Sequence, residues 1–138
     1  MPTSRILPSL TDEAALRRVP ERTTEAWASY DANAFADAFT EDTKVVIGGT
    51  YLRGRGEVRS YMSAAFSGPI KGTTVASDPI SVEYFSVDAG LVITEGGIML
   101  PGETFVSAAH AIRATWVLTA KDGEWRIRAY HSSPIPQT

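Results

Sequence analysis

The sequence contains no cysteine, and only two histidines stand among its 138 residues. Without cysteine there is no disulfide framework, no thiolate nucleophile and no cysteine-based metal site. His110 and His131 are far apart in the chain and have no adjacent carboxylate, which is not the spacing of metal ligands. The sequence therefore predicts no metal and no cofactor.

Strong charge and long apolar runs are also lacking. There are 13 basic and 16 acidic residues, for a net charge of −3, and the basic residues are scattered, so no positive stripe for nucleic acid is formed. No apolar run approaches the length of a membrane span, and residues 1–8 lack the apolar core of a signal peptide. We expect neither a nucleic-acid nor a membrane partner, and a cytoplasmic location.

What is present is an ordinary globular composition, with 43% hydrophobic residues. The length predicts one domain over residues 1–138, preceded by a flexible tail at residues 1–9. No repeat or linker divides the chain. The first half reads as helices and the second as strands, an order that favours an α+β fold over alternating βαβ units.

The helical half begins with an apolar stripe over residues 10–30 that ends at Trp27 and Tyr30. Pro20 lies inside this stripe and predicts a break or kink, because proline removes a helical hydrogen bond. Asp31 is placed to cap a short second helix. A third helix, opened by residues 54–57 and stopped at residues 68–69, repeats apolar residues at helical spacing.

A short strand is predicted at residues 43–47, and residues 51–53 either pair back on it or continue it. Four longer strands are predicted at residues 75–85, 89–98, 108–120 and 125–133. Pro79 marks an edge strand or a bulge. Asp122 and Gly123 form a two-residue type I′ turn, which places Trp116 opposite Ala129 and Ala114 opposite His131, with these side chains on the apolar face.

The preceding hairpin is open to two interpretations. If Pro101-Gly102 is its turn, His110 lies opposite Ile93 and Glu95 lies opposite Ala108. A longer loop through residues 103–107 would change this register, and the sequence leaves the register of residues 98–107 undecided.

Four motifs in order carry a family resemblance. They are Trp27-Ala-Ser-Tyr30-Asp31, Phe39-Thr-Glu-Asp42, the stretch Gly49-Thr-Tyr-Leu-Arg-Gly54-Arg55, and the final hairpin Asp122-Gly123-Glu124-Trp125-Arg126-Ile127. Together they resemble the SnoaL-like branch of the nuclear-transport-factor-two-like (NTF2-like) superfamily. The resemblance is greatest to the SgcJ/EcaC group, which is associated with enediyne biosynthesis, and it covers Asp12 to Pro134.

The resemblance implies a cone-shaped, curved antiparallel sheet wrapped around two or three N-terminal helices. It also implies a central cavity and a homodimer packed through the sheet. The superfamily includes isomerases, polyketide cyclases, dehydratases and plain binding domains, so the fold alone does not choose an activity. Residues 44–47 contain no carboxylate where ketosteroid isomerases of the superfamily carry one, which argues against that chemistry.

Four residues are candidates for acid–base catalysis: His110, Asp31, Tyr30 and Glu95. His110 lies on the apolar face of its predicted strand. It is interpreted either as a catalytic general acid or base, or as a hydrogen-bonded histidine of the core. Tyr30-Asp31 resembles the Tyr-Asp pair of scytalone dehydratase, although Asp31 is equally a helix cap. Glu95 is either an inward carboxyl group with a raised pKa or a solvated rim residue.

An aromatic-rich pocket is predicted around these candidates. Its members are the inward side chains of Trp27, Tyr30, Tyr51, Tyr61, Phe66, Trp116 and His131. Such a pocket suits a flat, hydrophobic or polyene-like ligand such as a polyketide intermediate.

The sequence thus supports three hypotheses. The first is a protein of secondary metabolism that performs cofactor-free cyclisation, isomerisation or dehydration. The second is a non-catalytic protein that binds or sequesters a polyketide or polyene intermediate. The third is a dimeric interaction module with a filled core.

Overall fold

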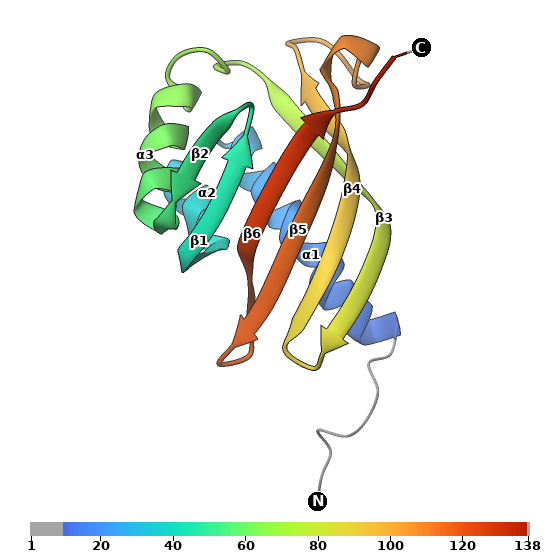
Figure 1. The fold of residues 1–138 in the computed structure, drawn as a ribbon. Helices are drawn as coiled ribbons and strands as arrows, with labels where there is room; N and C mark the ends of the chain where they lie inside the picture. Colours follow the sequence, from blue (N-terminus) through green and yellow to red (C-terminus); the bar gives the residue numbers. More distant parts are fainter. Residues whose placement is uncertain (1–9, 138) are drawn as a thin grey trace, which may run out of the picture.

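The fold is a curved six-stranded sheet with three helices packed against one of its faces (Figure 1). The computed structural model describes residues 10–137, so the tail predicted for residues 1–9 lies outside the described residues. Helix α1 (Leu10–Ala28) crosses behind the sheet in Figure 1. Helices α2 (Ala32–Asp37) and α3 (Gly54–Phe66) lie beside the β1 and β2 strands, at one side of the sheet. The predicted α+β fold is confirmed.

The sheet has the strand order β2-β1-β6-β5-β4-β3. In chain order the strands are β1 (Phe39–Ile47), β2 (Thr50–Arg53), β3 (Thr74–Ser86), β4 (Ala89–Met99), β5 (Ala111–Lys121) and β6 (Glu124–Pro134). Neighbouring strands are antiparallel except β1 and β6, which run parallel. The β1-β2 hairpin is therefore joined to the four-stranded meander through β6.

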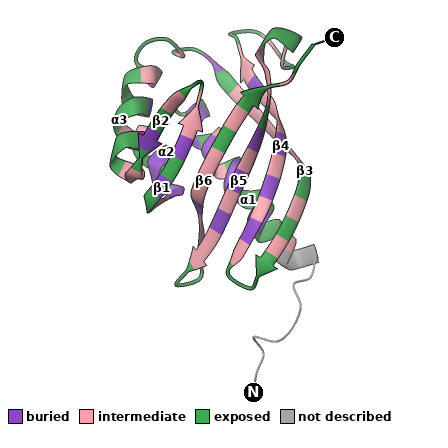
Figure 2. Cartoon of the chain, viewed as in Figure 1, coloured by how far each residue is buried: buried purple, intermediate pink, exposed green. Residues whose placement is uncertain are grey.

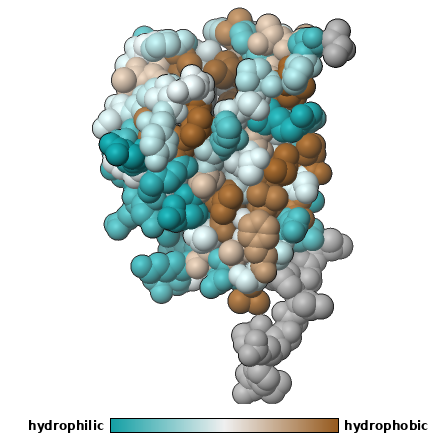
Figure 3. Space-filling model, viewed as in Figure 1, coloured by the Kyte–Doolittle hydropathy of each residue, from teal (hydrophilic) through white to brown (hydrophobic). Residues whose placement is uncertain are grey.

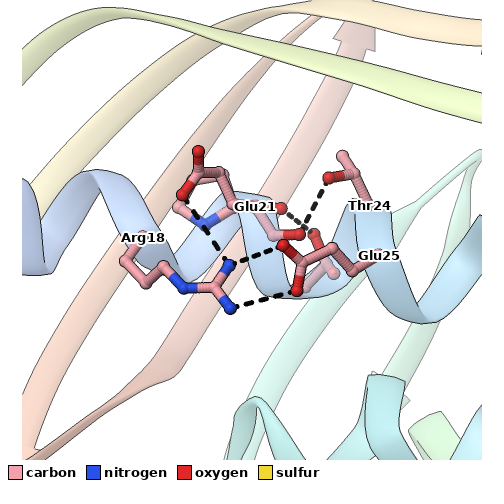
Figure 4. Close-up of polar contacts among 6 residues, drawn as sticks. Arg18, Glu21, Thr24 and Glu25 are labelled. Atoms are coloured by element: carbon pink, nitrogen blue, oxygen red, sulfur yellow. Dashed lines mark hydrogen bonds and ion pairs between the residues drawn. The ribbon is translucent and has the colours of Figure 1, made fainter.

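Helix α1 runs without interruption through Pro20, which corrects the predicted break. Leu16, Val19 and Trp27 form its buried face, and the Thr23 hydroxyl donates to the Pro20 carbonyl at 2.7 Å. On the exposed side, Arg18 pairs with Glu25 and Glu21 (Figure 4). Exposed ion pairs contribute little, so the apolar face holds this helix on the sheet.

The core lies between α1 and the middle of the sheet (Figure 2). Val92, Trp116, Leu118 and Ile127 alternate with more exposed positions along β4, β5 and β6 and are at most 4% exposed. Fully burying a side chain of this size is worth about 1.5–3 kcal/mol relative to solvent exposure. This alternation sets which side chains can reach the space between sheet and helices.

The last hairpin follows the predicted register only near its turn. Lys121 pairs with Glu124 and Leu118 pairs with Ile127 as expected, but the register then shifts by one residue between Val117 and Leu118. Trp116 consequently pairs with Tyr130, and not with Ala129 as predicted. A β-bulge of this kind moves every later side chain of the strand to the other face.

Thr43 accounts for the position of the bulge. It is fully buried, and its hydroxyl lies 3.0 Å from the Ile127 carbonyl and 3.2 Å from the Arg128 carbonyl. These carbonyls stand where β6 departs from regular pairing, and a buried carbonyl requires a donor. The bulge therefore depends on a strand that is more than 80 residues distant in the chain.

The β4-β5 hairpin has the longer loop. β5 begins at Ala111 and is preceded by a short 3₁₀ helix, η2 (Ala108–His110). Glu95 pairs with Arg113 and Ile93 pairs with Thr115, so the register that follows from a Pro101-Gly102 turn is wrong. The prediction for Pro79 is confirmed, because β3 is an edge strand with a register shift between Pro79 and Ser81.

The sheet face turned away from the helices carries apolar side chains at its centre. Figure 3 views this face and shows hydrophobic residues gathered over β4 and β5. Leu91 and Val117 are paired there and remain partly exposed, as does Ile93. We call Leu91, Ile93 and Val117 the open sheet face.

Within the described part of the chain, no helix combines the length and apolar character needed to cross a membrane.

Candidate functional site

A cavity of about 40 Å³ lies between the helices and the concave face of the sheet. Each of the three α-helices and six strands contributes to its wall, as expected for the interior of a cone. The lining residues are Thr23, Trp27, Phe35, Phe39, Val45, Ile47, Leu52, Val58, Met62, Val75, Ala76, Ser77, Thr94, Gly96, Ile112, Trp116 and Tyr130. Most of this wall is aliphatic or aromatic.

Aromatic rings form two sides of the cavity. On the helical side, Trp27 meets Phe35 edge-on with ring centroids 6.2 Å apart, and Phe35 packs on Phe39 at 5.5 Å. On the sheet side, Trp116 meets Tyr130 edge-on at 4.8 Å and 85°. Edge-to-face contacts of this kind fix ring orientation, so the cavity has rigid aromatic walls.

Each tryptophan of the wall has a hydrogen-bond partner for its indole N–H. Trp27 Nε1 donates to Thr73 Oγ1 at 3.1 Å, and Trp116 Nε1 donates to Thr94 Oγ1 at 2.9 Å. Buried indole groups without a partner would destabilise the fold. These bonds leave the ring faces, and no indole N–H, available to a ligand.

Tyr130 is the one titratable side chain among the described residues that line the cavity. Burial raises its pKa above the ordinary value of 10.0, and a hydrogen bond with Ser132 partly offsets that effect. The phenol is therefore protonated and neutral across the physiological range. A wall without carboxylate, imidazole, ammonium or guanidinium groups suits an uncharged ligand.

Of the residues predicted to form the pocket, Trp27 and Trp116 line the cavity. Phe66 is buried but stands behind Trp27, with ring centroids 5.6 Å apart. Tyr51 is 56% exposed on β2 and Tyr61 is 36% exposed on α3. Their helical and strand positions point these two rings to solvent, which corrects their predicted inward placement.

His131 is exposed on the opposite face of the sheet, where it pairs with Thr115 and Val46. Because of the bulge, Tyr130 faces the cavity and His131 faces away from it, which is the reverse of the predicted arrangement. No alternation rule applied to β6 alone reveals this, since the cause is the contact with Thr43. The only local signal was that regular alternation would bury an imidazole and turn a tyrosine outward, which is an unfavourable combination.

Tyr30 and Asp31 lie together at the surface beside α3, and not in the cavity. Asp31 Oδ1 accepts from the Ala34 backbone N–H at 2.9 Å and so caps α2. Tyr30 has a positive φ of 53° and is 41% exposed, and its hydroxyl donates to the Thr73 carbonyl at 3.2 Å. The geometry supports the helix-cap interpretation of Asp31.

His110 and Glu95 belong to η2 and β4, and neither borders the surface hollows that Asp31 borders. His110 lies in η2, with Nδ1 3.2 Å from the Ser107 hydroxyl. Glu95 is on the open side of β4 and pairs with Arg113 at 2.6 Å, which supports the solvated-rim interpretation over the inward one. β4 is apolar on both faces, and Val92 and Thr94, instead of Ile93 and Glu95, point inward.

The four catalytic candidates are therefore not brought together. Asp31 and Glu95 border separate hollows of the surface, and neither borders the cavity. Among the described residues, no three histidine, aspartate or glutamate side chains gather as potential metal ligands.

This architecture is shared with solved structures of the NTF2-like class. A domain of unknown function with a cystatin-like fold from Nostoc punctiforme PCC 73102 matches with a TM-score of 0.84 and 26% identity, over 94% of this chain and 81% of that chain. An NTF2-like protein with a cystatin-like fold from Novosphingobium aromaticivorans matches with a TM-score of 0.79 and 15% identity, over 94% and 85%.

A candidate scytalone dehydratase from Novosphingobium aromaticivorans also matches, with a TM-score of 0.73 and 13% identity over 94% of this chain and 91% of that chain. At such identities the likeness shows the fold alone. The comparison with curated proteins finds no match.

The sequence itself matches the SnoaL-like domain over residues 16–137. The chain belongs to the SnoaL-like domain family, within the NTF2-like class that its fold defines. The narrower resemblance to the SgcJ/EcaC group stays a prediction.

Proposed function

We propose that the chain binds a small, uncharged, largely apolar molecule in the cavity and does so without acid–base catalysis there. The observation that carries this proposal is the composition of the wall, in which Tyr130 is the sole titratable group among the described lining residues. Acid–base catalysis needs a group that exchanges protons near neutral pH, and a raised tyrosine pKa lies far from that range.

The size of the cavity limits the ligand. Typical ligand pockets measure about 300–1,000 Å³, whereas this cavity measures about 40 Å³. A ring-sized ligand therefore enters only if lining side chains move. Met62 is suited to this movement, because its unbranched side chain adapts to irregular space.

Binding can be tested with ethylbenzene and the variant Val58→Phe. Val58 is 1% exposed and lines the cavity, so a phenyl ring at this position occupies the space that the ligand needs. We expect ethylbenzene to change the tryptophan fluorescence of the native protein saturably, since Trp27 and Trp116 line the cavity. The variant should bind at least tenfold more weakly.

Val87→Phe is the matched control, because Val87 is 55% exposed and remote from the lining residues. It should bind ethylbenzene like the native protein. Melting curves verify that both variants are folded, since overpacking a core costs about 1–3 kcal/mol. Equal binding by native protein and Val58→Phe would refute the cavity as the site.

We propose further that the ligand is an intermediate of a secondary-metabolite pathway, such as a polyketide or enediyne precursor, encountered in the cytoplasm. Support comes from membership in the SnoaL-like family, which includes polyketide cyclases, and from the motif resemblance to the SgcJ/EcaC group. The cavity volume favours one ring of such a molecule over an extended polyene. Mass spectrometry of molecules retained from a producing extract tests this, and retention of none would contradict it.

We also propose that two copies pair through the open sheet face. An apolar centre bordered by polar residues is typical of a protein–protein interface, and Leu91, Ile93 and Val117 supply such a centre.

A further inference from the structure

The cavity has a polar edge that the aromatic and aliphatic lining does not explain. Thr94 is 2% exposed on β4 and lines the cavity. Its hydroxyl oxygen accepts the indole proton of Trp116, but no acceptor for the hydroxyl's own proton is in hydrogen-bond contact within residues 10–137. Thr94 therefore presents a donor at the wall that the protein itself does not use.

Tyr130 is a second hydroxyl-bearing residue of the cavity wall. Trp116 links the two residues, because its indole N–H bonds to Thr94 and its ring packs edge-on against Tyr130 at 4.8 Å. The raised pKa of Tyr130 keeps the phenol protonated, so it remains a potential donor well above neutral pH. Trp116 thus positions two neutral hydroxyl-bearing side chains, of which Tyr130 also has a hydrogen bond with Ser132.

The wall around this pair discriminates against charge. No basic side chain is among the described lining residues, so a carboxylate ligand would lose its hydration without gaining a counter-ion. No acidic side chain is there either, and an ammonium ligand meets the same penalty. A neutral ligand with a hydrogen-bond acceptor avoids both desolvation penalties and can accept the proton of the Thr94 hydroxyl.

We propose that Thr94 and Tyr130 are specificity residues that select a neutral single-ring ligand carrying a hydrogen-bond acceptor, such as a ring ketone or an aromatic aldehyde. This inference rests on the proposed binding function of the cavity. It adds the chemical class of the ligand and the two residues that recognise it.

Three probes of similar size separate the contributions of ring and acceptor: ethylbenzene has no acceptor, acetophenone has a neutral carbonyl oxygen, and benzoate is anionic. We expect the native protein to bind ethylbenzene and acetophenone and to show no benzoate binding at pH 7. The dissociation constants come from tryptophan fluorescence titrations confirmed by calorimetry.

Variants then test the two residues. Thr94→Val and Tyr130→Phe each remove a hydroxyl and keep the shape, so each should weaken acetophenone binding by about fivefold, the net worth of one hydrogen bond. Ethylbenzene binding should change less than about twofold. Thr94→Ser keeps the donor and should retain acetophenone binding.

Thr115→Val and Tyr51→Phe serve as controls, because Thr115 lies on the opposite face of β5 and Tyr51 is exposed. Neither should alter binding of any probe. Should Thr94→Val fail to fold for want of a partner for Trp116, Tyr130→Phe and Thr94→Ser still decide the question.

The possible outcomes distinguish a failure of this inference from a failure of the proposed binding function. If both hydroxyl-removing variants weaken ethylbenzene and acetophenone equally, the cavity binds apolar rings but the two residues are not selective. Benzoate bound as tightly as acetophenone would overturn the selection for neutral ligands. If neither ethylbenzene nor acetophenone binds the native protein, the proposed function fails, and this inference fails with it.

Discussion

At the scale of single residues, Tyr130 decides the character of the site. Strand alternation alone places Tyr130 outside and His131 inside, and the structure reverses both placements. An imidazole in the pocket could act as a general acid or base, whereas a protonated phenol can only form hydrogen bonds with a ligand near neutral pH. One extra residue in β6 thus changes the chemistry that the cavity supports.

The pKa of Tyr130 leads to a prediction for stability at alkaline pH. Burial raises the pKa in the folded state above the unfolded value of about 10. Below pH 10 both states keep the proton and the stability is fully present. As the pH rises through 10 and toward the folded pKa, the unfolded state alone ionises, so the free energy of unfolding falls.

Tyr130→Phe removes this ionisation. Between pH 9 and 11 the native protein should therefore lose more stability than the variant, as measured by urea unfolding at each pH. Tyr51→Phe, at an exposed position, should follow the native protein. Parallel curves for the native protein and Tyr130→Phe would contradict the burial of the phenol.

At the scale of helices and strands, the sequence predicts most of the fold because hydrophobic period and turn residues are local signals. The Asp122-Gly123 turn and the alternation after it give the correct register for the first four pairs of the last hairpin. The loop before β5 was harder, since no residue pattern distinguishes a two-residue turn at Pro101-Gly102 from a longer excursion. β4 was misassigned because it is apolar on both faces, one toward the core and one on the open sheet face.

The open sheet face carries the prediction at this scale. If two copies pair there, light scattering should give twice the chain's 14.9 kDa. Val117→Glu places a carboxylate at the centre of the face and should weaken pairing by at least tenfold, because a charge in an apolar interface lacks a partner. Thr74→Glu, at an exposed position on the edge strand β3, is the control. A native protein of monomeric mass at 50–100 micromolar, on the order of typical assay concentrations, would contradict the pairing.

At the scale of the whole molecule, the aromatic lining was predicted in part and the polar edge was missed. Trp27 and Trp116 were expected there because each lies on the apolar face of its own helix or strand. Thr94 was not, since its role depends on the indole of a neighbouring strand. The candidates Asp31, His110 and Glu95 were individually plausible, but only the three-dimensional arrangement shows that they lie apart.

The most direct test of the central claim is a methyl NMR titration of the native protein with ethylbenzene. The account predicts saturable shifts at the methyl groups of Val45, Val58 and Met62, which line the cavity. The methyl groups of Leu91 and Val87, which lie outside it, should remain unchanged. Shifts confined to Leu91 or Val87, or no saturable shift at any methyl group, would contradict a ligand-binding cavity in this protein.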